Sequence, residues 1–402
     1  MNRSSSNHTA FFSAACLAMG VMVSPLSMPF AGNSAGMLGY ALLWILPVAA
    51  LLNFFTASQY YTVLSSQPES WPVPACSWFQ TVFAVLQVVA FLFFCLAAST
   101  LILAAAGYVF NEVFVRWFPN LFFSVCLLVF ILAVNFADSR VSGYFQIASV
   151  FLFSGAVLLL SVIGLLTLDR PLFGNVDVPG ILSFEARPVF MLFWIFMAAE
   201  LAMYHEKQNK TLLPDSYFLI FAFAVVFALF WLWSMVSIAA APPHILVEST
   251  GPQNVAAHFI AGDTGRRIIG VALLAGSFAG VNLLLLGTGS VFNALVSPAA
   301  GKGEARKKVS TRNGFVAVLC LIILAMLLGG MAGKEITFTI KRAAFYLWLI
   351  TYAGLNLYLL RHRASSGITV FVAASIGVSV IYIIAFVVLA ATDPQLKEVI
   401  IF

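Results

Sequence analysis

The sequence predicts an all-α polytopic membrane protein, and three observations lead to that prediction. The chain of 402 residues is 62% hydrophobic and only 9% charged. Soluble domains carry about a quarter charged residues, so lipid must be the solvent for most of this apolar surface. The apolar residues fall into eleven stretches, each near the length of about 20 residues that a helix needs to cross a bilayer. The charged residues lie mostly between these stretches, where they set topology and do not form a nucleic-acid surface.

The eleven expected spans differ in length, and the third and eighth are long enough to tilt or to extend beyond the bilayer. Their ranges are 10–31, 36–62, 75–108, 119–136, 141–168, 187–205, 215–241, 266–296, 314–333, 338–360 and 366–391. The first stretch lacks a small-residue cleavage site after it and is expected to be retained as a span. The connector 241–265 is expected to be the longest loop, with a short surface helix over Asn254–Ile260.

Orientation follows from the basic residues in short loops. An N-terminus inside the cell places eleven of the 20 lysines and arginines on the inner side, so the total decides little. The densest basic cluster, Gly301–Arg312, then lies inside, and we expect a cytoplasmic N-terminus in the inner membrane of a bacterium. Five basic residues of the outer side sit at span ends, where long side chains can reach the interface. These are Arg187, Arg266, Arg267, Lys341 and Arg342.

The five cysteines show no CxxC spacing and are expected to be small buried hydrophobes. The five histidines lie in or beside expected loops. The sequence therefore predicts neither a disulfide framework nor a metal site, and no cofactor is expected.

The first span is expected to be unwound in its middle. Pro25 lacks an N–H, and its ring clashes with the carbonyl four residues earlier. Pro29 follows it, and Gly20 and Gly32 flank the pair. Such breaks are tolerated in membranes where the backbone is buried in protein or lines a cavity. A simple proline kink is the alternative.

The sixth span contains Glu200, the one acidic residue that lies within an apolar run. A carboxylate inside the membrane is costly and is a candidate functional residue for that reason. We consider it a candidate for coupling or gating. The alternative is a carboxylate that caps a half-helix and binds only its own backbone. This span has no Gly or Pro in its middle, so propensity does not demand a break.

Span six follows span one at an offset of five spans, which is odd, so the two enter the membrane from opposite sides. Paired interrupted helices related in this way are typical of inverted repeats with a binding site near the midplane. The expected organisation is one membrane domain with a first repeat over 1–168, a second over 187–360 and an additional span over 366–391.

Several segments resemble the amino acid–polyamine–organocation (APC) transporters, which have a LeuT-type five-plus-five inverted repeat. The resemblance covers nearly the whole chain and is most specific around Phe193–Glu200, which is similar to the family pattern FFAFxGFE. The further segments that carry it are Lys207–Pro214, Tyr60–Glu69, Val134–Ser142, Ser277–Asn282 and the connector 241–265, which matches an outer loop that helps cover the site.

The sequence departs from the family at the residues that recognise substrate. The GxG of the first span is Met22-Val23-Ser24 here, followed by Pro25 and Leu26. In the sixth span the family's glycine is Ala198, and the aromatic gate residue after it is Ala199. The chain looks most like shorter bacterial members, some of which export amino acids such as methionine and branched-chain residues.

The resemblance implies a substrate site where spans one and six break. The backbone N–H groups around Val23, Ser24, Pro25 and Leu26 would then meet a substrate carboxylate. Carbonyls freed near Phe193, Ile195 and Phe196 would accept from an ammonium. Phe196, Ala199 and Leu26 would form an apolar side-chain pocket. Asn282 would hydrogen-bond across the first span, or would only stabilise packing between helices.

The sequence thus predicts a secondary active transporter of amino acids or related small zwitterions or amines, working by alternating access. An amino-acid exporter or exchanger is the alternative. An enzyme would need paired Asp, a Ser–His pair or HExxH within the spans, and a channel would need polar stripes; neither pattern is apparent. The coupling ion (H⁺ or Na⁺), the substrate, the direction and the oligomeric state remain open.

Overall fold

The computed structural model describes residues 3–66, 78–137, 139–167, 192–208, 216–296, 305–363 and 369–392, which form helices joined by turns without a strand among them. The α-helices are α1 (Arg3–Met19), α2 (Ser27–Leu38), α3 (Leu42–Ser66), α4 (Trp78–Val109), α5 (Asn120–Ala137), α6 (Ser139–Thr167), α8 (Ala199–Gln208), α9 (Tyr217–Ala240), α10 (Pro243–Glu248), α11 (Pro252–Val296), α12 (Ala305–Leu328), α13 (Glu335–Arg363) and α14 (Thr369–Thr392). Short 3-10 or π segments are η1 (Gly39–Ala41), η2 (Phe110–Phe114), η4 (Leu192–Phe196) and η5 (Met331–Gly333).

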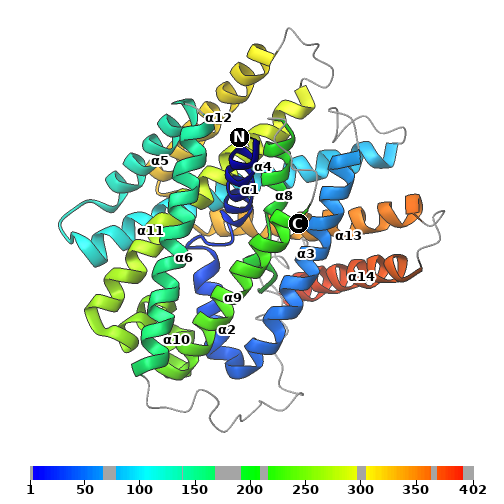
Figure 1. Ribbon diagram of the computed structural model, residues 1–402. Helices are drawn as coiled ribbons and strands as arrows, with labels where there is room; N and C mark the ends of the chain where they lie inside the picture. The colour runs from blue at the N-terminus through cyan, green and yellow to red at the C-terminus, as the bar shows by residue number, and fades with distance from the viewer. Residues whose placement is uncertain are drawn as a thin grey trace.

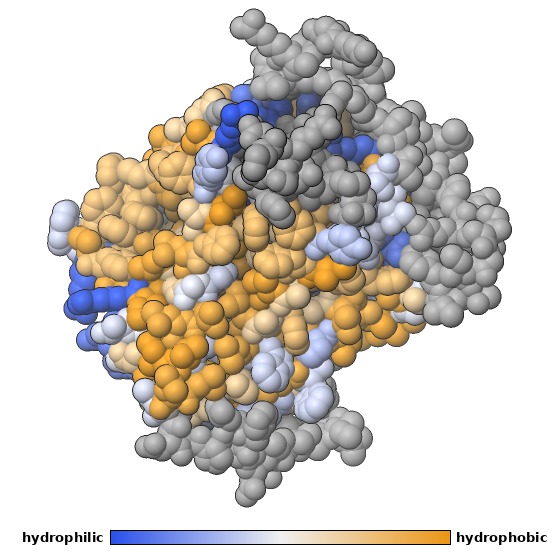
Figure 2. All heavy atoms as spheres, viewed as in Figure 1, coloured by the Kyte–Doolittle hydropathy of each residue, from blue (hydrophilic) through white to orange (hydrophobic). Residues whose placement is uncertain are grey.

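The chain is a multi-pass membrane protein. Within the described ranges, seven helical segments are long and apolar enough to cross a bilayer. Large apolar side chains such as Phe122, Leu166 and Leu321 are exposed on α5, α6 and α12, where a soluble protein would bury them. Figure 2 shows hydrophobic residues spread over the middle of the visible face, with hydrophilic residues gathered toward its ends. Helices lie in all eleven expected ranges, of which 75–77, 168, 187–191, 215 and 366–368 lie outside the described residues.

The connector 241–265 is helical, which corrects the expectation of a long loop. It forms α10 and the beginning of α11, and the expected short helix over Asn254–Ile260 is part of the latter. Both helices begin at a proline, Pro243 and Pro252, in the position where the missing N–H costs nothing. The α11 helix then bends at Gly262, whose φ of 58° suits a residue without Cβ.

The core is built around α11, which packs against α6, α4 and α8. The α13 helix packs against α4 on one side and α14 on the other, and Figure 1 shows α13 and α14 side by side. The two short helices α1 and α2 lie against α9, and α2 also contacts η4. These contacts bring the interrupted parts of the chain into the interior.

Candidate functional site

The first span is unwound between Met19 and Ser27, as the prolines predicted. Pro25 leaves the carbonyl of Val21, four residues earlier, without its helical donor. The Ser27 hydroxyl and the Ser24 N–H donate to that carbonyl instead, both at 3.2 Å. Residues within the break therefore replace the hydrogen bond that Pro25 removes from the Val21 carbonyl.

The N–H groups of Val23, Ser24 and Leu26 are already hydrogen-bonded, contrary to the expectation that they point free into a cavity. The Val23 N–H donates to Met19 O at 3.0 Å, and the Leu26 N–H donates to the Ser24 hydroxyl at 3.3 Å. Pro25 has no N–H to offer. A substrate carboxylate would have to compete with these short-range bonds.

The sixth span is also broken, which propensity alone did not demand. The 3-10 segment η4 ends at Phe196, and α8 starts at Ala199. Ala198 connects them with φ of 78°, a left-handed conformation that is unusual for a residue with a Cβ. The carbonyls of Ile195 and Phe196 receive no hydrogen bond from any residue that the structure describes. Two bare acceptors therefore lie at this break.

Replacing Ala198 by glycine is expected to leave the protein as stable as the wild type or slightly more so. The left-handed conformation costs alanine about 1–2 kcal/mol, and glycine avoids this cost. Glycine also raises the conformational entropy of the unfolded chain, which lowers the free energy of unfolding by about 0.4–1 kcal/mol and offsets part of the gain. Ala202→Gly, in the regular part of α8, is the matched control and should destabilise by about 1 kcal/mol. Apparent melting temperatures of the two variants test the difference, and equal losses would show that Ala198 is not strained.

The two breaks lie next to each other in the interior. The α2 helix packs on η4, α1 packs on α8, and the rings of Phe30 and Trp194 are 5.6 Å apart. On the other side α11 approaches the first break through glycine, because a Cβ on Gly280 would stand 2.9 Å from Ser24 Cβ. Ser24 and Phe196 are at most 1% exposed. The breaks are therefore closed off from solvent in this conformation.

Of the residues proposed from the sequence, most meet at this point. Val23, Ser24, Pro25, Leu26, Phe193, Ile195, Phe196 and Ala199 all lie in or beside the two breaks. The Phe193 carbonyl receives the side-chain amide of Asn53, on α3, at 3.5 Å. Whether these residues bind substrate stays a prediction.

Glu200 is fully buried in the first turn of α8 and faces α13. Trp348 Nε1 donates to its Oε1 at 2.5 Å, and the Tyr352 hydroxyl lies 2.9 Å from both carboxylate oxygens. The alternative that this carboxylate binds only its own backbone is therefore wrong. No lysine, arginine or histidine among the described residues pairs with it. It is a buried acid held by neutral donors.

Asn282 does not hydrogen-bond directly to the first span. Its amide donates to Gln146 Oε1 at 2.8 Å, and its oxygen accepts from Ser142 at 3.4 Å, so both direct partners lie on α6. Gln146 in turn donates to the carbonyl of Cys16, on α1, at 3.1 Å. Asn282 thus reaches α1 through Gln146 and belongs to a polar contact between three helices.

Sequence reasoning did not find the α13 residues that contact the sixth span. Lys341, Phe345, Trp348 and Tyr352 follow one another at helical spacing and form a single stripe, which we call the α13 stripe. Phe345 stacks on Trp194 with ring centroids 4.1 Å apart, and the next two residues bind Glu200. The spacing is the signal that could have identified them.

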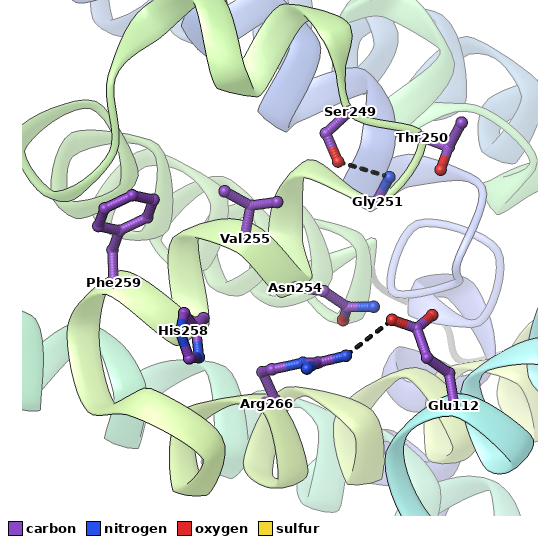
Figure 3. A pocket seen from close by; sticks show the side chains of 9 residues that line it. All are labelled: Glu112, Ser249, Thr250, Gly251, Asn254, Val255, His258, Phe259 and Arg266. Carbon is purple, nitrogen blue, oxygen red and sulfur yellow. Dashed lines mark hydrogen bonds and ion pairs between the residues drawn. The ribbon is translucent and has the colours of Figure 1, made fainter. Parts of the chain in front are cut away.

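A separate polar hollow of about 270 Å³ lies at the surface, where the α10–α11 turn meets η2 (Figure 3). Arg266 forms an ion pair with Glu112 at 2.7 Å across its floor. Ser249, Asn254 and His258 are among its other lining residues, and none of the residues that line it belongs to either break. It is distinct from the candidate site.

Comparison with known proteins shows the fold. No family model and no curated protein sequence matches the chain. Solved structures do match, among them a histidine-to-alanine mutant of the Eremococcus coleocola manganese transporter, with TM-score 0.54 and 12% identity over 97% of this chain and 90% of that one. The same transporter in complex with an aromatic bis-isothiourea substituted compound gives TM-score 0.53 and 12% identity over 99% and 92%. The chain therefore shares the fold of a membrane transporter.

Proposed function

We propose that the chain is a secondary active transporter of amino acids or related small zwitterions or amines, working by alternating access in the cytoplasmic membrane. The observation that carries the proposal is the pair of interrupted spans packed against each other in the interior. Irregular backbone at membrane depth is tolerated where it lines a site. Transporters place their substrate at such discontinuous helices.

The chemistry of the breaks suits a small organic amine better than a bare metal ion. The Ile195 and Phe196 carbonyls are acceptors for an ammonium, and the surrounding side chains are mostly apolar. We place the two repeats of a LeuT-type fold at 1–168 and 187–360, so that each repeat contributes one broken span. The resemblance to the APC family supports this division into repeats. Export or exchange is equally compatible with the site, and the coupling ion is H⁺ or Na⁺.

A divalent metal ion is the second candidate substrate, because the fold neighbours are structures of a manganese transporter. Hard divalent ions prefer several carboxylate or other oxygen ligands. Among the described residues no group of three His, Cys, Asp or Glu side chains is placed to hold a metal. Glu200, the one acid at the breaks, has both oxygens engaged by α13. The zwitterion therefore fits the described residues better.

The test is a thermal-shift screen of the purified protein against the twenty amino acids, matching amines and MnCl₂, with and without sodium at several pH values. A ligand present at about 100 times its dissociation constant stabilises by about 2.7 kcal/mol. We expect at least one amino acid or amine to raise the melting temperature. Stabilisation by Mn²⁺ alone would contradict the proposal and support the second candidate.

A further inference from the structure

Lys341 is buried inside the protein and does not reach toward an interface, as its position near a span end had suggested. It lies in the second turn of α13 and is only 9% exposed. Its ammonium stands 5.3 Å from the ring centroid of Trp194, 5.4 Å from that of Phe30 and 5.5 Å from that of Phe338. Three aromatic rings therefore surround one cation.

Two of these rings come from the broken spans themselves. Phe30 belongs to α2, which follows the first break, and Trp194 belongs to η4, which precedes the second. Only Phe338 comes from α13. The ammonium is thus positioned by the same two half-helices whose ends form the candidate site.

The charge of Lys341 is not balanced within the described part of the chain. No carboxylate of a described residue pairs with it, and the charged group that acts on it is Arg342, which has the same sign. The faces of aromatic rings attract a cation. The free energy of that attraction is small compared with the hydration free energy that a buried ammonium loses. An anion in contact with the ammonium would offset this loss. The buried Lys341 ammonium is therefore suited to bind an anion that does not belong to the described part of the chain.

At the first break, no N–H group between Val23 and Leu26 is free for such an anion. The Val23 and Leu26 N–H groups are already bonded, and Pro25 has none. A carboxylate approaching the two breaks from the side of α2 and η4 meets the Lys341 ammonium, which lies against Phe30 and Trp194. We propose that Lys341, held between Phe30, Trp194 and Phe338, binds the carboxylate of the transported molecule. This assignment rests on the proposed function and narrows its substrate to carboxylate-bearing compounds.

Three probes that differ only in charge test the site: L-leucine, its amide leucinamide, and 4-methylpentanoate, which keeps the carboxylate and lacks the amine. Binding is measured by thermal shift and tryptophan fluorescence on wild type, Lys341→Gln and Lys341→Arg. Lys334→Gln removes an exposed lysine just before α13 and is the matched control. We expect Lys341→Gln to weaken the binding of leucine and 4-methylpentanoate by about tenfold or more. Lys341→Arg and Lys334→Gln should retain it, and any binding of leucinamide should not change.

The outcomes separate this inference from the proposed function. Equal losses for leucine and leucinamide would mean that Lys341 only supports the structure, and unchanged binding of both carboxylates would overturn the site. If no amino acid bound the wild type, the proposed function would fail, while Lys341-dependent binding of 4-methylpentanoate would still support an anion site. If neither carboxylate bound the wild type, the inference would fail as well.

Discussion

Glu200→Gln is expected to impair coupled transport strongly while leaving the protein folded. Glutamine has the shape of glutamate, so its oxygen can accept from Trp348 while its amide turns toward the Tyr352 hydroxyl. What it loses is the ability to bind and release a proton in the interior, so the variant tests Glu200 as a candidate coupling residue. Uptake into proteoliposomes of the amino acid or amine identified by the thermal-shift screen should fall by about tenfold or more. A tenfold change corresponds to a free-energy difference of about 1.4 kcal/mol. The apparent melting temperature should stay near the wild-type value.

Two further variants serve as controls for Glu200→Gln. Glu200→Leu leaves the Trp348 N–H and the Tyr352 O–H without their acceptor, at a cost of about 1–3 kcal/mol each, and should destabilise the protein strongly. Glu248→Gln makes the same change at an exposed carboxylate at the end of α10 and should alter neither property. If Glu200→Gln transported normally at wild-type expression, the carboxylate would have no part in coupling.

Gly276→Val is expected to destabilise the protein and to prevent substrate binding together. A Cβ at this position on α11 would overlap the backbone carbonyl of Val23 and stand 3.0 Å from the ring of Phe153. Backbone at the first break cannot move aside as a flexible side chain could. Overpacking a core typically costs about 1–3 kcal/mol, and here the strain falls on the break itself. Thermal stability and ligand binding are measured on the same purified variant.

The control for this change is Gly155→Ala on α6, where an added Cβ meets nothing within 4 Å. It should leave stability and binding close to wild type. Gly280→Ala is intermediate, because its nearest neighbour is a side-chain atom, Ser24 Cβ. Wild-type stability and binding in Gly276→Val would show that α11 does not press on the first break.

Residue propensity predicted the first break, whereas the second was expected only from the family resemblance, for a physical reason. Pro25 removes a donor wherever it stands, so its effect can be read locally. Ala198 adopts its left-handed backbone only because the surrounding packing imposes it. Glu200 could be found because a single acid stands out within an apolar run. Its partners Trp348 and Tyr352 lie 148 and 152 positions further along the chain, so the local sequence could not identify them.

The α13 stripe shows why membrane sequences hide such contacts. In a soluble helix, apolar periodicity reveals the face that is buried. In a membrane helix lipid and protein interior are both apolar, so buried Phe345 and exposed Ile350 look alike in the sequence. Lys341 was the one residue of the stripe that differed in polarity, and its position near a span end pointed to the interface. The family, the repeat and the substrate remain predictions, while the membrane transporter fold is shown.

The two breaks also impose an order on assembly in the bilayer. The first segment satisfies its orphaned Val21 carbonyl with its own Ser27, so this carbonyl needs no partner from another helix. The sixth segment depends on other helices. No described residue donates to its Ile195 and Phe196 carbonyls, its Phe193 carbonyl accepts from Asn53 on α3, and its Glu200 accepts from donors on α13. We therefore expect the sixth segment to reach this arrangement only after α13, which follows it by more than a hundred residues, has docked.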